Sequence, residues 1–529
     1  MARRAALLFA ALAVIHTWPL ASAPGRLSLN HNSDAQLNAW ILSWVAHTLP
    51  TDPRDLFNGN IFTPETGTLA YTDPTIVPAL FGAPVWWLGG SPVLVFNLVL
   101  LAGLTATALA GWWVAWKWIG SNGAALVAGA LVAFNPHVLT RLPHTVAAHL
   151  WGLPLVLYFA DRLVERPSRR DGLLLALIVA ATAATSVYWL ALAGLVVGVV
   201  ITVGLLAGRW RGALAAGAAA GAGVVAAAPV LVPYVRFAAG GATRPLEIVA
   251  QFTATPAGYL ASMSRLHAGW TAPFFRDDVN VFFAGATAIA LAVAGLAVAC
   301  RSVTSRRRAI TLVTIAAAGV VLSLGPDTPL YVWLYEHVAP LHGIRAPARF
   351  GYLYLMVVAL AAGYGLAWVL NRARTRRSAI AAAALALVTV EAAHAPIRTT
   401  AFAGVPPIYS LVAEVDEPVV LVEVPFWPPD VMHENGEYVL NGTAHWRPLM
   451  NGYSGFTPMS YRERSATFWY FPREGTVEAM RAAGATHVMV HLERFDERER
   501  REVSENLLGR RDLWLVAGDS FGHRLYEVH

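Results

Sequence analysis

The sequence predicts a polytopic α-helical membrane protein with about eleven transmembrane helices and a small α+β domain after the last of them. Of the 529 residues, 56% are hydrophobic and only 14% are charged, and the mean hydropathy is +0.50, so the chain is far more apolar than soluble globular proteins. Runs without charge, such as residues 172–208, exceed the about 20 residues that one span requires. Short arginine clusters separate these runs, as is typical of basic cytoplasmic loops.

The basic clusters predict the orientation of the spans. They lie at Arg3–Arg4, around Lys117, and at residues 162–170, 209–211, 301–308 and 372–377, and all should face the cytoplasm. Spans are therefore expected near residues 5–22, 92–116, 122–136, 148–163, 171–186, 188–207, 212–235, 279–300, 309–325, 351–371 and 378–395. This odd number places the N-terminus inside and the C-terminus outside.

Two segments allow more than one interpretation. Residues 74–90 are apolar but short and contain Pro78 and Pro84, so a re-entrant or surface-lying piece is expected there rather than a span. Residues 5–21 resemble a signal peptide because the A-x-A-like Ala21-Ser22-Ala23 follows them, although an uncleaved first span is favoured.

The predicted boundary between two domains lies near Pro396. Residues 1–395 form the membrane domain, whose three large outer loops, 22–73, 236–278 and 326–350, should pack together into an outer vestibule. Residues 396–529 form the extracytoplasmic α+β domain. Its expected strands are 419–424, with Glu423 at the polar position, 486–491, 513–516 and 524–528, and its expected helices are 477–483 and 494–508.

The charge pattern and the cysteine content argue against a nucleic-acid partner and against a disulfide. The net charge of +6 arises from the clusters between spans, so the positive-inside rule explains it and no nucleic-acid partner is expected. The single cysteine, Cys300, excludes a disulfide within the chain.

The first outer loop contains the best candidates for catalysis. Asp34, in the segment 30–36 directly after span one, is placed to meet a lipid head group, although it or Ser33 could instead cap the helix that follows. Asp55 and Asp73 lie further along, where carboxylates and amides are dense enough to bind sugar hydroxyls or a divalent cation such as Mg²⁺ or Mn²⁺. Asp73-Pro74 is equally a turn pattern, and no spacing matches a known metal loop, so the metal ligands stay unassigned.

Basic side chains of the other outer segments are candidates for phosphate contact. Arg345 and Arg349 lie on a side where arginines should be rare, and the guanidinium fork suits phosphate. Snorkelling of Arg349 from the start of a span is the alternative. His137, His144 and His149 are expected to line the vestibule, with His144 the best candidate for substrate contact.

Aromatic side chains are dense in residues 426–471 of the C-terminal domain. Flat aromatic faces beside amides could bind sugar rings, and the segment contains Trp427, Trp446, Asn451, Tyr453, Phe456, Tyr461, Trp469 and Tyr470. Core packing or docking on the bilayer surface is the favoured interpretation for most of them.

The span pattern and the first loop resemble the GT-C superfamily of integral membrane glycosyltransferases, in particular its bacterial mannosyl- and arabinosyltransferase-like branch. In that family an acid just past span one is the catalytic base and sugars arrive on polyprenyl phosphate. Asp34 in Ser33-Asp34-Ala35 occupies the matching position. The pair of adjacent acids common in the family is absent here, which puts a metal requirement in question.

The resemblance implies an inverting glycosyltransferase in the bacterial inner membrane. It would move a sugar from a polyprenyl-phosphate donor to an envelope glycan, lipid or protein at the outer face. The alternatives are a transporter or flippase for a lipid-linked glycan, which should have ionisable residues in mid-span, and a non-catalytic scaffold related to these enzymes.

Overall fold

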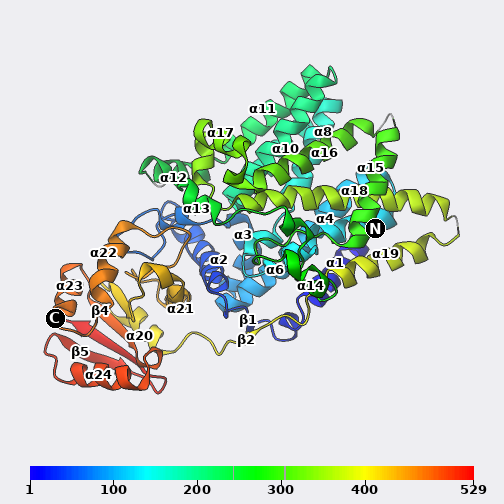
Figure 1. Ribbon diagram of the computed structural model, residues 1–529. Helices are drawn as coiled ribbons and strands as arrows, with labels where there is room; N and C mark the ends of the chain where they lie inside the picture. The colour runs from blue at the N-terminus through cyan, green and yellow to red at the C-terminus, as the bar shows by residue number, and fades with distance from the viewer. Residues whose placement is uncertain (242, 303–304, 374, 417) are drawn as a thin grey trace. The chain divides into compact units, whose positions relative to one another are not determined.

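The computed structural model describes residues 1–529 except 242, 303, 304, 374 and 417 (Figure 1). The chain is mostly helical, with a small sheet in its C-terminal part. It divides into two compact units, each made of two stretches of sequence. Unit 1 contains Met1–Ser22 and Val99–Ile397, and unit 2 contains Ala23–Leu98 and Arg398–His529. Arg374, a member of the last predicted basic cluster, lies outside the described residues.

Helices form near all of the predicted spans. They are α1 (Ala2–His16), α4 (Pro92–Ile119), α5 (Asn122–Ala133), α8 (Gly152–Glu165), α9 (Arg169–Thr185), α10 (Val187–Leu206), α11 (Trp210–Ala226) with α12 (Ala228–Ala239), α15 (Ala286–Arg301), α16 (Arg306–Ser323), α18 (Gly351–Arg372) and α19 (Arg377–Glu391). Within the described residues, four helices are long and apolar enough to cross a membrane, or five if the pair α11–α12, bent by 75°, is one broken span. The chain is thus a multi-pass membrane protein, and the number eleven stays a prediction.

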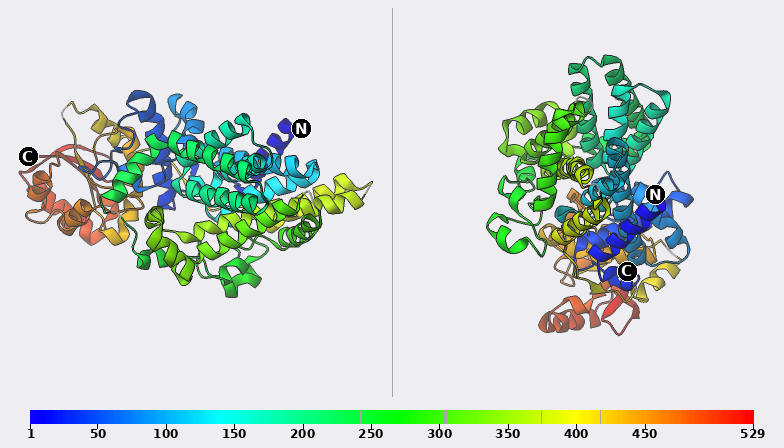
Figure 2. Two further views of the ribbon diagram at one scale, coloured as in Figure 1. Left: turned by 90° about the horizontal axis from the view of Figure 1, so that it is seen from above. Right: turned by 90° about the vertical axis from the view of Figure 1, so that its right-hand side faces the viewer.

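Helices α8, α9, α10 and α11 pack side by side in unit 1 (Figure 2). Another close contact, between α15 and α18, depends on glycine. Where α15 crosses α18, a Cβ atom on Gly295 would lie 1.9 Å from the Ala361 carbonyl oxygen, and one on Gly365 would lie 2.0 Å from that of Leu291. Only glycine permits this approach, which brings the two helix backbones into direct contact.

An ion-pair network joins the basic clusters at one end of these helices. Arg308 donates to Asp161 at 2.8 Å and to Glu165 at 3.1 Å, and Arg307 contacts the same two carboxylates. The guanidinium of Arg209 donates to the Glu165 carbonyl oxygen at 3.4 Å. Three clusters that the positive-inside rule assigns to one side of the membrane therefore meet at one end of unit 1. Their orientation to the membrane stays a prediction.

The sheet of unit 2 has the strand order β3-β4-β6-β5. β3 (Leu421–Val424) is parallel to β4 (His487–His491), and β6 (His523–Val528) is antiparallel to both β4 and β5 (Leu513–Gly518). α23 (Thr476–Ala482) and α24 (Glu497–Leu508) occupy the predicted helical positions, and α24 lies beside the sheet (Figure 1). α20 (Ile408–Glu414), α21 (Gly436–Asn441) and α22 (Met459–Phe468) were not predicted.

The first loop packs with the C-terminal domain. The Leu449 N–H donates to the Asn60 carbonyl at 2.8 Å, and the Phe62 N–H donates to the Asn451 carbonyl at 3.0 Å. β1 (Leu27–Ser28) also pairs with β2 (Thr400–Ala401). The loop, residues 22–73, was predicted to belong to the membrane domain, residues 1–395. These backbone bonds place it in unit 2 instead.

Residues 74–90 form a short apolar helix, α3 (Ile76–Trp87). Its 12 residues are fewer than a span requires. Leu80, Phe81, Trp87 and Leu88 are exposed on it and just after it. An apolar surface of this kind fits the prediction that the segment lies on the membrane or re-enters it.

Candidate active site

Asp34 lies in the first turn of α2 (Ser33–Thr51). The helix is capped by Asn32, whose backbone is extended and whose Oδ1 accepts the Asp34 N–H at 2.9 Å. The alternative role of Asp34 or Ser33 as the cap does not apply, because the helix begins at Ser33 and Asn32 occupies the cap position. The Asp34 carboxylate is not used for capping.

The Asp34 carboxylate is bound by the C-terminal part of the same unit. The Tyr453 hydroxyl donates to Asp34 Oδ1 at 2.8 Å, and Asp34 is half-buried. A hydroxyl donor fixes the direction of the carboxylate oxygen that accepts from it. Tyr453 was expected to be a core, docking or sugar-binding aromatic, so sequence reasoning missed this contact. The aromatic segment did mark the right region.

Tyr453 is held in place by its neighbours. The Asn451 side chain accepts the Glu423 N–H at 2.8 Å and donates to the Glu423 carbonyl at 2.9 Å, which ties the segment to β3. A Cβ atom on Gly452 would lie 2.6 Å from the Phe62 ring, so glycine is needed for this close approach. The segment that carries Tyr453 is therefore fixed at the two residues before it, Asn451 and Gly452.

The other acids of the first loop have local partners. Asp55 is exposed, and its Oδ1 accepts from the Asn58 amide at 2.7 Å within a turn. Asp73 is half-buried, and its carbonyl accepts from the Thr75 hydroxyl at 3.1 Å. Among the described residues, the acids of this loop do not form a group of three histidine or carboxylate side chains close enough to share an ion.

Several tryptophans near the first loop are packing residues. Trp40 is fully buried and donates to Asn60 Oδ1 at 3.0 Å, and Trp44 donates to the Leu56 carbonyl at 2.8 Å. Trp446 stacks on the His47 ring, with centroids 4.7 Å apart. For Trp446 the favoured interpretation, core packing, fits the structure.

Arg345 and Arg349 lie around Tyr188 in unit 1. The Tyr188 hydroxyl accepts the N–H of Arg345 at 2.9 Å and that of Ala346 at 3.3 Å. The Arg349 guanidinium lies 4.0 Å from the centre of the Tyr188 ring, and that of Arg345 lies 4.8 Å from the Phe252 ring. Both arginines are half-buried. Arg349 is thus stacked on an aromatic ring within the protein, which explains its position better than snorkelling does.

A third arginine belongs to this group. Burial lowers the pKa of Arg244, and the charge of Arg345 lowers it further. The backbone of Arg244 is fixed because its N–H donates to the His342 carbonyl at 2.9 Å and its carbonyl accepts from the Tyr335 hydroxyl at 2.7 Å. Like charges gathered in a partly buried place are typical of an anion-binding site. Arg244 was not predicted from the sequence, although it too is an arginine on the side of the membrane where arginines should be rare.

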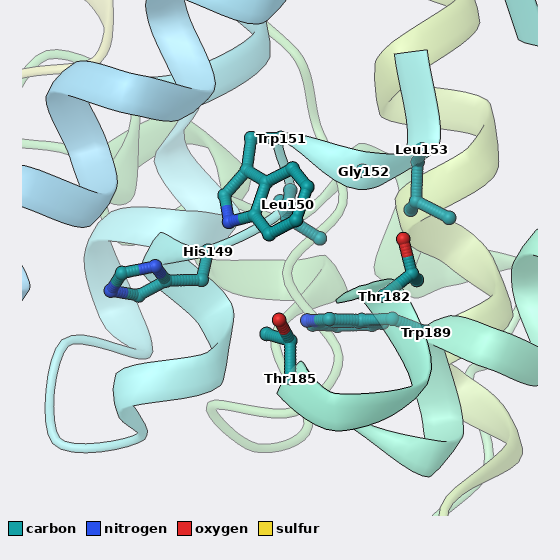
Figure 3. A pocket seen from close by; sticks show the side chains of 8 residues that line it. All are labelled: His149, Leu150, Trp151, Gly152, Leu153, Thr182, Thr185 and Trp189. Carbon is teal, nitrogen blue, oxygen red and sulfur yellow. The ribbon is translucent and has the colours of Figure 1, made fainter. Parts of the chain in front are cut away.

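The histidines do not share one environment. His137 is buried and stacks on Phe282 at 4.2 Å, and His149 is buried with its Nε2 3.1 Å from the Val99 carbonyl. His149 borders a narrow cavity, also lined by Trp151, Thr182 and Trp189, that has no room for a water molecule (Figure 3). Both rings belong to the packed interior, which corrects the expectation that they line a vestibule. His144, half-buried at the start of α7 (Thr145–Ala148), stays a candidate.

The predicted site residues are divided between the two units. Asp34, Asp55 and Asp73 belong to unit 2, whereas Arg345, Arg349 and His144 belong to unit 1.

The fold is similar to that of solved membrane glycosyltransferases. Arabinofuranosyltransferase AftD from mycobacteria superposes on all of the chain with a TM-score of 0.60 and 16% identity, and a mutant of AftD superposes on 99% of it with a TM-score of 0.57. The chain spans 40% of the length of AftD. ArnT from Cupriavidus metallidurans is less similar, with a TM-score of 0.41 and 14% identity. No protein-family model and no curated protein sequence matches the chain. The resemblance to GT-C glycosyltransferases is confirmed at the level of the fold.

Proposed function

We propose that this chain is a glycosyltransferase of the bacterial inner membrane that moves a sugar from a polyprenyl-phosphate donor to a hydroxyl of an envelope glycan, lipid or protein at the outer face. The likeness in fold to an arabinofuranosyltransferase supports the reaction class. The observation that carries the proposal is the placement of Asp34, a carboxylate not used for capping and oriented by the Tyr453 hydroxyl.

The reaction needs a base for the acceptor. Asp34 takes the proton of the acceptor hydroxyl as its oxygen attacks the anomeric carbon of the sugar. The bond from that carbon to the phosphate oxygen breaks, and the configuration at the carbon inverts. Tyr453 acts as a positioning residue, since its hydrogen bond directs one carboxylate oxygen. A general base contributes about 10²- to 10⁴-fold to the rate.

The reaction also needs cations for the leaving group. As the bond to the sugar breaks, negative charge grows on the polyprenyl phosphate, and guanidinium groups stabilise it. Arg345 and Arg349 supply this charge in unit 1, and Arg244 adds to it. His144 and Asp73 remain proposed contacts to substrate. Asp55 is the weakest candidate, because it is exposed and bound within its own turn.

The transporter alternative requires ionisable residues in mid-span. The buried acid Asp161 instead lies in the last turns of α8 and pairs with Arg307 and Arg308 in the first turn of α16. These ion pairs join the ends of two helices and do not form a row of ionisable groups along a span. It favours the enzyme over the transporter.

The substitution Asp34→Asn tests the proposal. The cap of α2 is Asn32, so this change leaves the cap intact and removes only the basic oxygen. Mass spectrometry of envelope glycans from a deletion strain identifies the missing sugar, and transfer of that labelled sugar is then followed in membranes at matched expression. We expect Asp34→Asn to lower the rate at least about 10²-fold.

The matched control is Asp52→Asn, which makes the same chemical change at an exposed acid of the same loop. It should retain near-normal activity. An Asp34→Asn protein that keeps more than about a tenth of the wild-type rate would exclude Asp34 as the base.

A further inference from the structure

Two histidines of the sheet in unit 2 lie directly opposite each other. His491 ends β4 and His523 begins β6, and the two residues are partners in the antiparallel ladder. Their ring centroids are 5.0 Å apart, and both side chains are buried. Glu493 follows two residues after His491. Its Oε1 lies 3.1 Å from His491 Nδ1 and 3.5 Å from His523 Nε2.

These three side chains have the spacing of metal ligands. One nitrogen from each ring and one carboxylate oxygen lie within 4.8 Å of one another, and the structure offers no second group of three among the residues it describes. Zinc binds nitrogen and oxygen at about 2.0–2.1 Å, which places neighbouring tetrahedral ligands about 3.3 Å apart. The distances from Glu493 Oε1 to the two ring nitrogens, 3.1 and 3.5 Å, lie on either side of that value.

The outward nitrogen of each ring is bound by a carboxylate. His491 Nε2 lies 2.5 Å from Glu423 Oε2, and His523 Nδ1 lies 2.6 Å from Asp519 Oδ2. Such a bond holds the proton on the outer nitrogen and leaves the inner nitrogen free to ligate. Metal-binding histidines almost always have a partner of this kind.

Both carboxylates are themselves fixed. Glu423 is fully buried on β3, although strand alternation predicted a polar, outward position for it, and its Oε2 also accepts from the Tyr409 hydroxyl at 3.1 Å. Asp519 Oδ1 accepts the N–H of Phe521 at 2.9 Å and that of His523 at 3.0 Å, which shapes the turn before β6. Residues from four segments, at 409, 423, 491–493 and 519–523, thus meet in one small volume.

Charge balance favours a cation in this place. Three carboxylates, those of Glu423, Glu493 and Asp519, surround two imidazoles, and the second oxygen of Glu423 is buried without a hydrogen-bond partner. Without a metal ion, bound protons must balance the negative charge of these carboxylates. A divalent ion would supply the same charge at the inner nitrogens.

We propose that His491 Nδ1, Glu493 Oε1 and His523 Nε2 bind a Zn²⁺ ion in the C-terminal domain, with water as the fourth ligand. Two imidazoles and one carboxylate suit zinc better than magnesium, which prefers oxygen ligands. Glu493 is 36% exposed and gives the ion a path to solvent. The ion would join β4 to β6 and stabilise the domain, a role separate from sugar transfer.

Zinc content and thermal unfolding of the full-length protein in detergent test this proposal. The purified protein is loaded with Zn²⁺, passed over a chelating resin and analysed by elemental mass spectrometry. We expect about one zinc per chain, and a melting temperature that falls when a strong chelator removes it. Glu493→Gln and His523→Gln should lose the ion, and Asp519→Asn should weaken its binding by about 10- to 100-fold.

The control is His433→Gln, which removes a 51% exposed histidine paired with Glu434 in the same domain. It should retain the zinc. Glu493 is partly exposed, so Glu493→Gln is expected to fold even if His523→Gln does not.

Three results would overturn the proposal. Wild-type protein could keep no zinc after the resin, Glu493→Gln could keep as much as wild type, or zinc could leave the melting temperature unchanged. In any of these cases the cluster is a buried network of protonated histidines and carboxylates.

Discussion

Removing the carboxylate of Asp161 should strongly destabilise unit 1. Asp161 is 1% exposed and accepts from Arg307 and Arg308, whose side chains are 13% and 19% exposed. In Asp161→Asn, two largely buried guanidinium groups keep one carboxylate partner, Glu165, which is 32% exposed. Breaking a buried ion pair by removing one partner costs about 3–5 kcal/mol. We expect a loss in this range from the free energy of unfolding.

Glu165→Gln is the matched control, because it removes a carboxylate from the same two arginines nearer to solvent. Water screens that ion pair, so the free energy of unfolding is expected to fall by about 1 kcal/mol or less. The assay is reversible unfolding in mixed detergent micelles, followed by tryptophan fluorescence and circular dichroism. A double-mutant cycle of Asp161→Asn with Arg308→Gln should give a coupling of about 0.5–3 kcal/mol. The reasoning fails if Asp161→Asn is no more destabilising than Glu165→Gln.

Two further predictions concern the phosphate site and the topology. Arg345→Lys and Arg349→Lys should each raise the apparent KM for the polyprenyl donor without lowering protein abundance, because lysine lacks the guanidinium fork and its stacking on Phe252 or Tyr188. An unchanged KM in both would mean that these arginines only anchor the chain. Reporter fusions after Arg308 should report the cytoplasm and fusions after His529 the outer side, and a cytoplasmic C-terminus would refute the proposed outer-face reaction.

Features set by local pattern could be predicted from the sequence. The strand expected at 486–491 is β4, and the helix expected at 494–508 is α24, which a capping box at Asp496 and Glu499 begins. The expected spans near 188–207 and 351–371 correspond to α10 and α18, which are long and apolar enough to cross a membrane. In each case the hydrophobic periodicity or the length of the apolar run predicts the element, and contacts with distant residues do not alter that element.

Features set by distant contacts could not be predicted. Asn32, Ser33 and Asp34 are all good cap residues, so only the observed start of α2 selects Asn32. Glu423 was placed on a polar face because its strand was treated alone, whereas β3 is buried on both faces. His491 and His523 were not singled out, because a ladder partner is not visible in either strand by itself.

The hydrogen bond between Asp34 and Tyr453 joins residues 419 positions apart. Unit 2 contains both, yet residues 99–397 are made between its two stretches. During synthesis, Asp34 leaves the ribosome before Tyr453 and cannot bind it until the 419 residues up to Tyr453 have followed. Its environment is therefore completed last, after the membrane helices have been made. A nascent or truncated chain would carry the acid without its partner, so the order of synthesis itself delays the assembly of the proposed catalytic group.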